Sequence, residues 1–419
     1  MNRPFSAYAI CLMAILAALV SLTTACNSTG NAIPTDNITA GITDIPALKI
    51  REGMLAQADD WAIVQTEVAQ LREKIAKNPQ DYKSMLYLAA IYMQEARTTG
   101  EHPYYYPAAL QILDGILAQK PKDPDIQLQT LTSKASVCLS QHDFKQALAL
   151  GQQALALNDK FAAVYGVLVD ANVELGNYAD AVKMSDKMSA IRPDLRSYSR
   201  VSYLRELHGD YQGALAAMRL AVEAGVPGAE NTEWCRFTLG ELYRRHNDLK
   251  NAELQYNMSL QLRPSYAFAQ NGLAEVALAR GEYDRALTLS EQAAAVMPEF
   301  SFYETQARVY QAQNQSEKVK SLTSDLLDML SEDRESGHNV DLEIAKIHLH
   351  LGNNAQKAKI LAQSEYAKRP ENISVNELMA QIALAQKDEV AAKNYLAKAT
   401  RTGYRSSETI ELQKQLSDN

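Results

Sequence analysis

Histidine side chains are the first candidates for chemistry in this chain, because imidazole binds metals and exchanges protons near neutral pH. Three of the seven, His142, His208 and His246, occupy the same turn position of repeated segments, so their spacing reflects a repeat and not a shared site. His348 and His350 are two residues apart and would point to different sides of a helix. The sequence therefore predicts no metal site.

Other patterns that carry chemistry are absent from the sequence. It contains no Gly-rich phosphate loop, no His-Glu-x-x-His, no Cys-x-x-Cys and no Gly-x-Ser-x-Gly. The net charge of -8 argues against binding to a phosphate backbone, which needs a concentrated face of lysine and arginine. We expect a protein that is not an enzyme, needs no cofactor and does not bind nucleic acid.

The N-terminus has the pattern of an export signal. Arg3 gives a short positive flank, and residues 8–20 form an apolar run that is too short to span a bilayer comfortably. Small residues at 23–25 then precede Cys26, which resembles the lipobox of bacterial lipoproteins, whose cysteine is lipidated and becomes the new N-terminus. The leucine of that motif is displaced by one place here, to Leu22.

The lipobox resemblance implies a membrane anchor on Cys26. Asn27 stands where an aspartate usually signals retention in the inner membrane, so the resemblance implies an outer-membrane lipoprotein that faces the periplasm. The alternative is ordinary signal-peptidase cleavage and a periplasmic or secreted protein.

The two remaining cysteines, Cys138 and Cys235, lie three repeats apart, on the order of 30 Å, which is too far for a disulfide. We expect both to be buried apolar side chains.

A short motif recurs along most of the chain. Residues 207–214 (LHGDYQGA) return as residues 279–286 (ARGEYDRA), with looser copies between them and before them. The aromatic or leucine position of the motif falls at 144, 178, 211, 249 and 283, so its steps are 34, 33, 38 and 34 residues. Pro193, Pro264 and Pro298 follow the same period, since they lie two periods and one period apart. Such a period indicates a repeat protein and not a single globular core.

The composition and the motif together predict stacked helix pairs. Alanine, leucine, glutamate, glutamine and lysine dominate, and no alternating run of valine and isoleucine is typical of a strand. Glycine, asparagine or aspartate in the middle of the repeat allows the chain to reverse. Small alanines at 147, 181, 214, 252 and 286 allow the second helix to approach the first. Each pair leaves an apolar face that only its neighbours can cover.

The pattern resembles the tetratricopeptide repeat. In one repeat the residues that match its signature are Leu239, Gly240, Tyr243, Asn247, Asp248, Ala252, Tyr256 and Pro264. The resemblance covers about residues 80–404 and implies an all-α, right-handed solenoid of about nine antiparallel helix pairs. The expected organisation is a signal peptide at 1–25, a flexible tether at 26–48, an N-terminal helix at 49–79, repeats one to seven at 80–330, the last two repeats at 331–404 and a capping C-terminal helix at 405–419.

The same resemblance implies a concave groove lined by the first helix of each pair. When the groove positions of the family are carried over one at a time, they fall on Arg196, Ser199, Tyr203, Glu206, Trp234, Phe237, Glu241, Arg244, Phe268, Asn271, Glu275 and Leu278. The candidate ligand-binding residues among them are Arg196, Tyr203, Trp234, Phe237, Glu241, Arg244, Phe268 and Asn271. Aromatic rings and guanidinium groups are enriched at recognition surfaces. The alternative is that the rings only fill gaps between repeats. The lysine and asparagine with which the family clamps C-terminal carboxylates are absent, so that activity is not implied.

A second candidate contact is the inserted stretch 97–107, which carries Tyr104, Tyr105 and Tyr106 between two prolines. The alternative is that these rings pack back onto the following helix.

The sequence as a whole predicts a scaffold of the cell envelope that binds an envelope or secreted protein in its groove. The alternatives are a protein that binds glycan or polysaccharide, and an accessory subunit that regulates an enzyme in an envelope or secretion complex.

Overall fold

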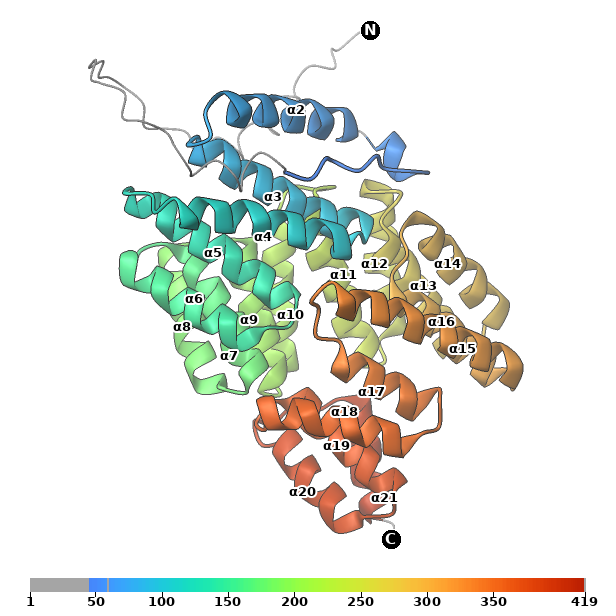
Figure 1. The fold of residues 1–419 in the computed structure, drawn as a ribbon. Helices are drawn as coiled ribbons and strands as arrows, with labels where there is room; N and C mark the ends of the chain where they lie inside the picture. Colours follow the sequence, from blue (N-terminus) through green and yellow to red (C-terminus); the bar gives the residue numbers. More distant parts are fainter. Residues whose placement is uncertain (1–44, 59, 418–419) are drawn as a thin grey trace, which may run out of the picture. The chain divides into compact units, whose positions relative to one another are not determined.

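Consecutive helices pack antiparallel in pairs, as the repeat predicts (Figure 1). The first five pairs are α3 (Tyr82–Thr99) with α4 (His102–Ala118), α5 (Pro124–Ser140) with α6 (Phe144–Leu157), α7 (Ala162–Leu175) with α8 (Tyr178–Ile191), α9 (Leu195–Leu207) with α10 (Tyr211–Glu223), and α11 (Glu230–Arg245) with α12 (Leu249–Leu262). The next four are α13 (Ala267–Ala279) with α14 (Tyr283–Val296), α15 (Phe300–Ala312) with α16 (Ser316–Glu335), α17 (Asp341–His350) with α18 (Ala355–Lys368), and α19 (Ile373–Ala385) with α20 (Glu389–Ala399). Helix α2 (Trp61–Lys77) precedes the nine pairs and α21 (Ser407–Ser417) follows them.

The computed structural model describes residues 45–58 and 60–417, all within the unit Gly41–Asn419. These residues form helices and no strand, so the all-helical prediction and the expected number of pairs are confirmed. None of these helices has both the length and the apolar character needed to cross a bilayer. The predicted signal peptide, Cys26 and most of the predicted tether lie outside the described residues.

The turn inside each pair is built in one way. In all nine described pairs the residue just before the N-cap of the second helix has a positive φ, as at Gly209 (75°) and Asn247 (60°). Glycine and asparagine tolerate this conformation, which explains the mid-repeat residues of the sequence motif. His142 (59°) takes the same conformation, whereas His208 and His246 lie one residue earlier in their turns. The three histidines therefore do not share one position, which corrects the expectation for His142.

Alanine allows the close approach of the two helices in a pair. The alanines predicted for this role are completely buried, namely Ala147, Ala181, Ala214, Ala252 and Ala286. A larger side chain at these positions would force the helices apart and lower the free energy of unfolding by about 1–3 kcal/mol.

Cys138 and Cys235 are buried and free, as expected. Burial raises the pKa of the Cys235 thiol to about 12.

The N-terminal helix is shorter than predicted. It begins at Trp61 and not at 49, and Leu55–Gln57 form a separate short 3-10 helix before it. The Arg51 guanidinium bonds the buried Glu95 carboxylate at 2.9 and 2.5 Å and Asp60 at 2.8 Å. Residues 45–48, the end of the predicted tether, are instead packed against α3 and α4: the backbone oxygen of Pro46, for example, accepts the Tyr92 hydroxyl.

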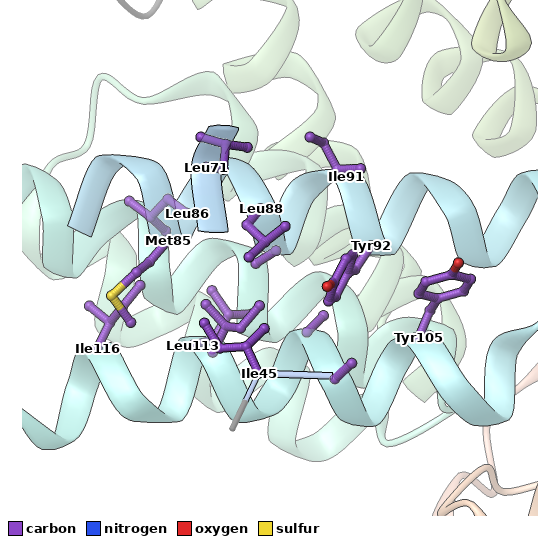
Figure 2. Packing of buried hydrophobic residues seen from close by; sticks show 14 of the residues in the cluster. Ile45, Leu71, Met85, Leu86, Leu88, Ile91, Tyr92, Tyr105, Leu113 and Ile116 are labelled. Atoms are coloured by element: carbon purple, nitrogen blue, oxygen red, sulfur yellow. The ribbon is translucent and has the colours of Figure 1, made fainter. Parts of the chain in front are cut away.

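The stretch 97–107 is not a loop. Helix α3 continues to Thr99 and α4 begins at His102, so the tyrosine triplet forms the first turns of α4. Tyr105 and Tyr106 are buried, at 0% and 5% exposure, and Tyr105 lies in the core among α2, α3 and α4 (Figure 2). The expectation of a contact loop is therefore wrong, and packing onto the neighbouring helices is the observed outcome.

The C-terminal part follows the prediction with one difference. The charged residues 331–335 extend α16 to Glu335 and do not form a joint, so the expected boundary at 330 falls inside a helix. Helix α21 buries Thr409, Leu412 and Leu416, as predicted, and its leucines pack with residues of α19 and α20. It caps the last pair.

Turns of the early pairs touch joints of the late pairs at a nearly constant sequence separation. The Nδ1 atom of His142 lies 2.9 Å from the backbone oxygen of Asn339, 197 residues away. The Tyr178 hydroxyl accepts the backbone N–H of Ile373, and Thr402 donates to the backbone oxygen of Leu207, in both cases across 195 residues. One stretch of repeats therefore packs along another in a fixed register.

Arg369 lies at the centre of this register. Its guanidinium bonds the carboxylates of Glu365 at 2.8 Å and Glu174 at 2.7 Å, and it lies 4.8 Å from the centroid of the Phe144 ring. The side chains of Arg369 and Glu365 are only 5% and 1% exposed. A buried charge network of this kind is costly to break, because the remaining charges lose their partner.

We expect Arg369→Ala to lower the free energy of unfolding by at least about 2 kcal/mol, because it leaves Glu365 buried with a weaker set of partners. The loss stays below that of an isolated buried pair, since Lys368 still bonds Glu365 at 2.8 Å. Urea denaturation followed by circular dichroism measures the change. The matched control is Arg285→Ala, whose side chain also bonds two glutamates but is 44% exposed, and which should cost less than about 1 kcal/mol. Equal losses in the two variants would contradict the assignment of Arg369 as a buried lock.

Candidate functional site

A cavity of about 230 Å³ lies between three successive first helices, α11, α13 and α15. Its lining residues are Phe237, Glu241, Arg244, Phe268, Asn271, Gly272, Glu275, Ser301, Phe302, Glu304, Thr305 and Arg308. A larger cavity of about 530 Å³ is lined mainly by residues of the α15–α16 turn and of α16. It contains none of the predicted site residues, so the smaller cavity is the candidate site.

Five of the eight predicted groove residues line this cavity: Phe237, Glu241, Arg244, Phe268 and Asn271. The other three do not reach it. Arg196 is exposed on α9, Tyr203 is 42% exposed on the same helix, and Trp234 is 44% exposed on α11. The structure thus brings together the central part of the predicted groove, and the binding of a ligand there stays a prediction.

Aromatic rings form one wall of the cavity. The ring centroids of Phe237 and Phe268 are 5.7 Å apart, and those of Phe268 and Phe302 are 5.5 Å apart. Phe302 is buried, whereas Phe237 and Phe268 are half-buried. This ring series fills the gap between helices, as the packing alternative predicts, and it also presents apolar area to the cavity.

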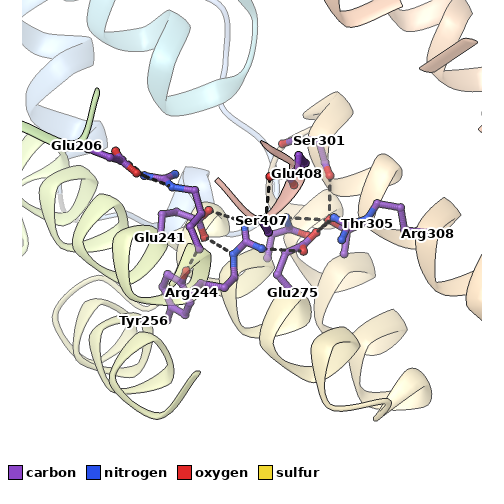
Figure 3. A network of polar contacts seen from close by, with 12 residues as sticks. Glu206, Glu241, Arg244, Tyr256, Glu275, Ser301, Thr305, Arg308, Ser407 and Glu408 are labelled. Atoms are coloured by element: carbon purple, nitrogen blue, oxygen red, sulfur yellow. Dashed lines mark hydrogen bonds and ion pairs between the residues drawn. The ribbon is translucent and has the colours of Figure 1, made fainter. Parts of the chain in front are cut away.

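A ladder of charged groups also lines the cavity, and Figure 3 shows its contacts. Arg244 bonds Glu241 of its own helix at 3.0 and 2.7 Å and reaches Glu275 of α13 at 3.5 Å. Glu275 accepts the Thr305 hydroxyl at 2.8 Å and the Arg308 guanidinium at 2.7 Å. The ladder therefore links three consecutive repeats and holds both arginines in place.

The ladder is fixed from behind by Tyr256 of α12. This ring is completely buried, and its hydroxyl donates to Glu241 at 2.5 Å. A Cβ atom on Gly240 would come within 2.4 Å of the ring, which explains glycine at that signature position. Burial alone would raise the pKa of Glu241, but the Arg244 guanidinium outweighs it, so this pKa lies below its usual value. Its contribution to stability is therefore present at neutral pH and lost as the pH falls through that lowered pKa.

Two acceptors in the cavity have unmet bonding capacity. Asn271 is 9% exposed and donates its amide to Thr305 at 3.1 Å, but its Oδ1 atom has no hydrogen-bond partner among the described residues. Burial raises the pKa of Glu304, whose carboxylate forms no ion pair within the described part of the chain. Unpartnered acceptors of this kind favour a ligand that brings hydrogen-bond donors.

The α15 residues of the site were not identified from the sequence. Their repeat lacks the Gly-Asp-Tyr turn, so its groove positions were not carried over. The signal was nevertheless available, because Asn271 and its partner Thr305 are one period of 34 residues apart, and Phe302 follows Phe268 by the same step. Arg308 and Glu304 fall between the expected positions, and only the fold shows that they reach the cavity.

Histidines do not gather into a metal site in the described region. His142 and His338 meet with ring centroids 4.5 Å apart, and burial lowers the pKa of His338 to about 3. No group of three or more histidine, cysteine, aspartate or glutamate side chains among the residues described could hold a metal ion.

The architecture and the cavity define the class: a helical-repeat protein whose first helices present a ligand-sized hollow. The tetratricopeptide repeat family model matches residues 139–206, which confirms the resemblance seen in the sequence over that span. Tetratricopeptide repeats generally mediate protein–protein interaction, and the fold is typically a non-enzymatic scaffold. No curated protein matches the chain.

Several solved structures are similar to this chain at low identity. A thermophilic TPR protein of Thermus thermophilus is 22% identical, with 47% of this chain and 99% of that chain covered and a TM-score of 0.41. The Pseudomonas aeruginosa PilF protein is 13% identical, with 70% and 99% covered and a TM-score of 0.37. YrrB, a TPR protein with an unusual peptide-binding site, is 18% identical, with 48% and 97% covered and a TM-score of 0.32.

We expect Trp234→Ala to change the free energy of unfolding by less than about 1 kcal/mol, because much of the ring is in solvent. Tyr256→Ala should cost about 3–5 kcal/mol, because it empties a fully buried aromatic position behind the ladder. Urea midpoints of the two variants measure the difference. A large loss for Trp234→Ala would show that this residue is part of the core.

Proposed function

We propose that this chain is a non-enzymatic scaffold that binds an extended segment of a partner polypeptide in the cavity between α11, α13 and α15. The observation that carries the proposal is the combination, in one cavity, of an aromatic wall and the unpartnered Asn271 acceptor. The general role of tetratricopeptide repeats in protein interaction supports it. Rings supply binding area at low entropy cost, and the fixed arginine ladder holds the site in shape before the partner arrives.

Site-specific photo-crosslinking tests this proposal. With p-azidophenylalanine in place of Phe237, we expect crosslinks from envelope preparations to one or a few partner polypeptides. The matched control places the same probe at Leu254, a 51% exposed residue on α12, the second helix of the same pair. Equal crosslinking from both positions, or none from Phe237, would contradict the proposal. Crosslinks from Phe237 to glycan alone would favour a polysaccharide ligand.

We further propose that the protein is exported and anchored by a lipid on Cys26 at the outer membrane, facing the periplasm. The apolar run at 8–20 and the small residues before Cys26 support this. An anchor would raise the local concentration of the scaffold near an envelope or secreted partner, so that weak contacts suffice. The partner complex is then an envelope or secretion assembly.

Replacing Cys26 by serine should move the protein from the detergent phase to the aqueous phase in Triton X-114 partitioning, because the acylated side chain is lost. Cys138→Ser provides the control, since this buried cysteine should leave the partitioning unchanged. Wild-type protein that already enters the aqueous phase would indicate ordinary secretion.

A further inference from the structure

The charges that line the cavity do not balance. It contains three carboxylates, on Glu241, Glu275 and Glu304, and two guanidinium groups, on Arg244 and Arg308. Arg244 bonds Glu241 at 2.7 Å and Arg308 bonds Glu275 at 2.7 Å. Glu304 is thus the carboxylate in excess.

Neighbouring groups do not neutralise Glu304. Lys346 and Glu343 of α17 act on it electrostatically in opposite directions, as do Arg308 and Glu275. Arg308 is the strongest favourable influence, but its charge already serves Glu275. The Oε2 atom of Glu343 is itself buried without a hydrogen-bond partner among the described residues, so it adds negative charge near Glu304.

Asn271 gives an independent indication of the same kind. Asn271 lines the cavity, and its Oδ1 atom is buried without a hydrogen-bond partner among the described residues. A buried acceptor without a donor destabilises the folded chain unless a donor reaches it. Both Glu304 and Asn271 can therefore accept hydrogen bonds from N–H groups of a ligand, and the Glu304 carboxylate also favours a ligand with positive charge.

The phenylalanine rings of the cavity further restrict the kind of side chain that fits. Phe237 and Phe268 are half-buried and offer apolar surface within the same cavity. A lysine or arginine side chain has an aliphatic stem that packs on such surface and a cationic head that aromatic faces also attract. An acidic side chain would meet the uncompensated Glu304, and an apolar side chain would leave Glu304 and Asn271 desolvated without partners.

We infer that the cavity is a pocket for a lysine or arginine side chain of the bound polypeptide, with the stem against Phe237 and Phe268 and the cationic head at Glu304 and Asn271. This inference rests on the proposed function. It adds the chemical class of the partner residue: the partner presents a basic residue in an extended segment.

Capped octapeptide pools provide the test. Each pool carries lysine, arginine, norleucine or glutamate at one fixed position and mixed neutral residues elsewhere, and fluorescence anisotropy measures binding to the full-length chain. We expect the lysine and arginine pools to bind at least about tenfold more tightly than the norleucine and glutamate pools, as is typical of a hydrogen-bonded charge pair. Glu304→Gln should remove most of this preference.

The control variant is Glu317→Gln, which removes the same charge from an exposed position on α16, the second helix of the same pair. It should keep the preference for basic pools. Equal binding of lysine and norleucine pools, or a preference that survives Glu304→Gln, would overturn the basic pocket while leaving peptide binding intact. Failure of every pool to bind would instead overturn the proposed function on which the inference rests.

Discussion

The structure depends on one constraint: no helix pair can bury its own apolar face. In the regular pairs a completely buried alanine, such as Ala214 or Ala252, allows the two helices to approach, and the apolar face that remains is covered by the next pair. Stacking is therefore obligatory, and it aligns the first helices side by side. Residues one period apart, such as Asn271 and Thr305, then become neighbours although 34 residues separate them in the chain. The candidate cavity is a direct consequence of this alignment.

A second level of packing follows from the first. The register of about 195 residues places turns of the early pairs against joints of the late pairs, where backbone groups would otherwise remain unpaired. Polar side chains supply the contacts there. Arg369 joins Glu365 to Glu174, and Arg401 donates to the backbone oxygen of Glu371 while lying 5.2 Å from the Tyr178 ring centroid. Apolar burial thus stabilises contacts between successive repeats, and ion pairs and hydrogen bonds stabilise contacts between the early and the late repeats.

The candidate site uses both kinds of interaction. Its ring series continues the apolar packing between repeats, and its ladder of Glu241, Arg244 and Glu275 fixes the polar wall without a ligand. These side chains are therefore structural as well as candidates for binding, and a single substitution in the ladder would disturb both roles. Glu304 and Asn271 differ from the ladder. Both line the cavity, but within the described chain Glu304 forms no ion pair and the Oδ1 atom of Asn271 accepts no hydrogen bond. The proposed chemistry of the ligand is therefore argued from these two residues.

The sequence by itself determined the helical class, the nine pairs, the buried alanines and the capping helix, because these follow from local periodicity and from the steric demands of a turn. It also located the central groove residues, since those positions repeat with the helix pairs. Only the tertiary structure decided that Tyr105 is buried, that Arg51 pairs with Glu95 and α2 begins only at Trp61, that Arg308 and Glu304 reach the cavity, and that early and late repeats meet 195 residues apart. These outcomes depend on side chains distant in the chain that compete for the same buried space and charge. The local sequence pattern cannot predict which side chain occupies such a place, because these contacts form only once the repeats are stacked.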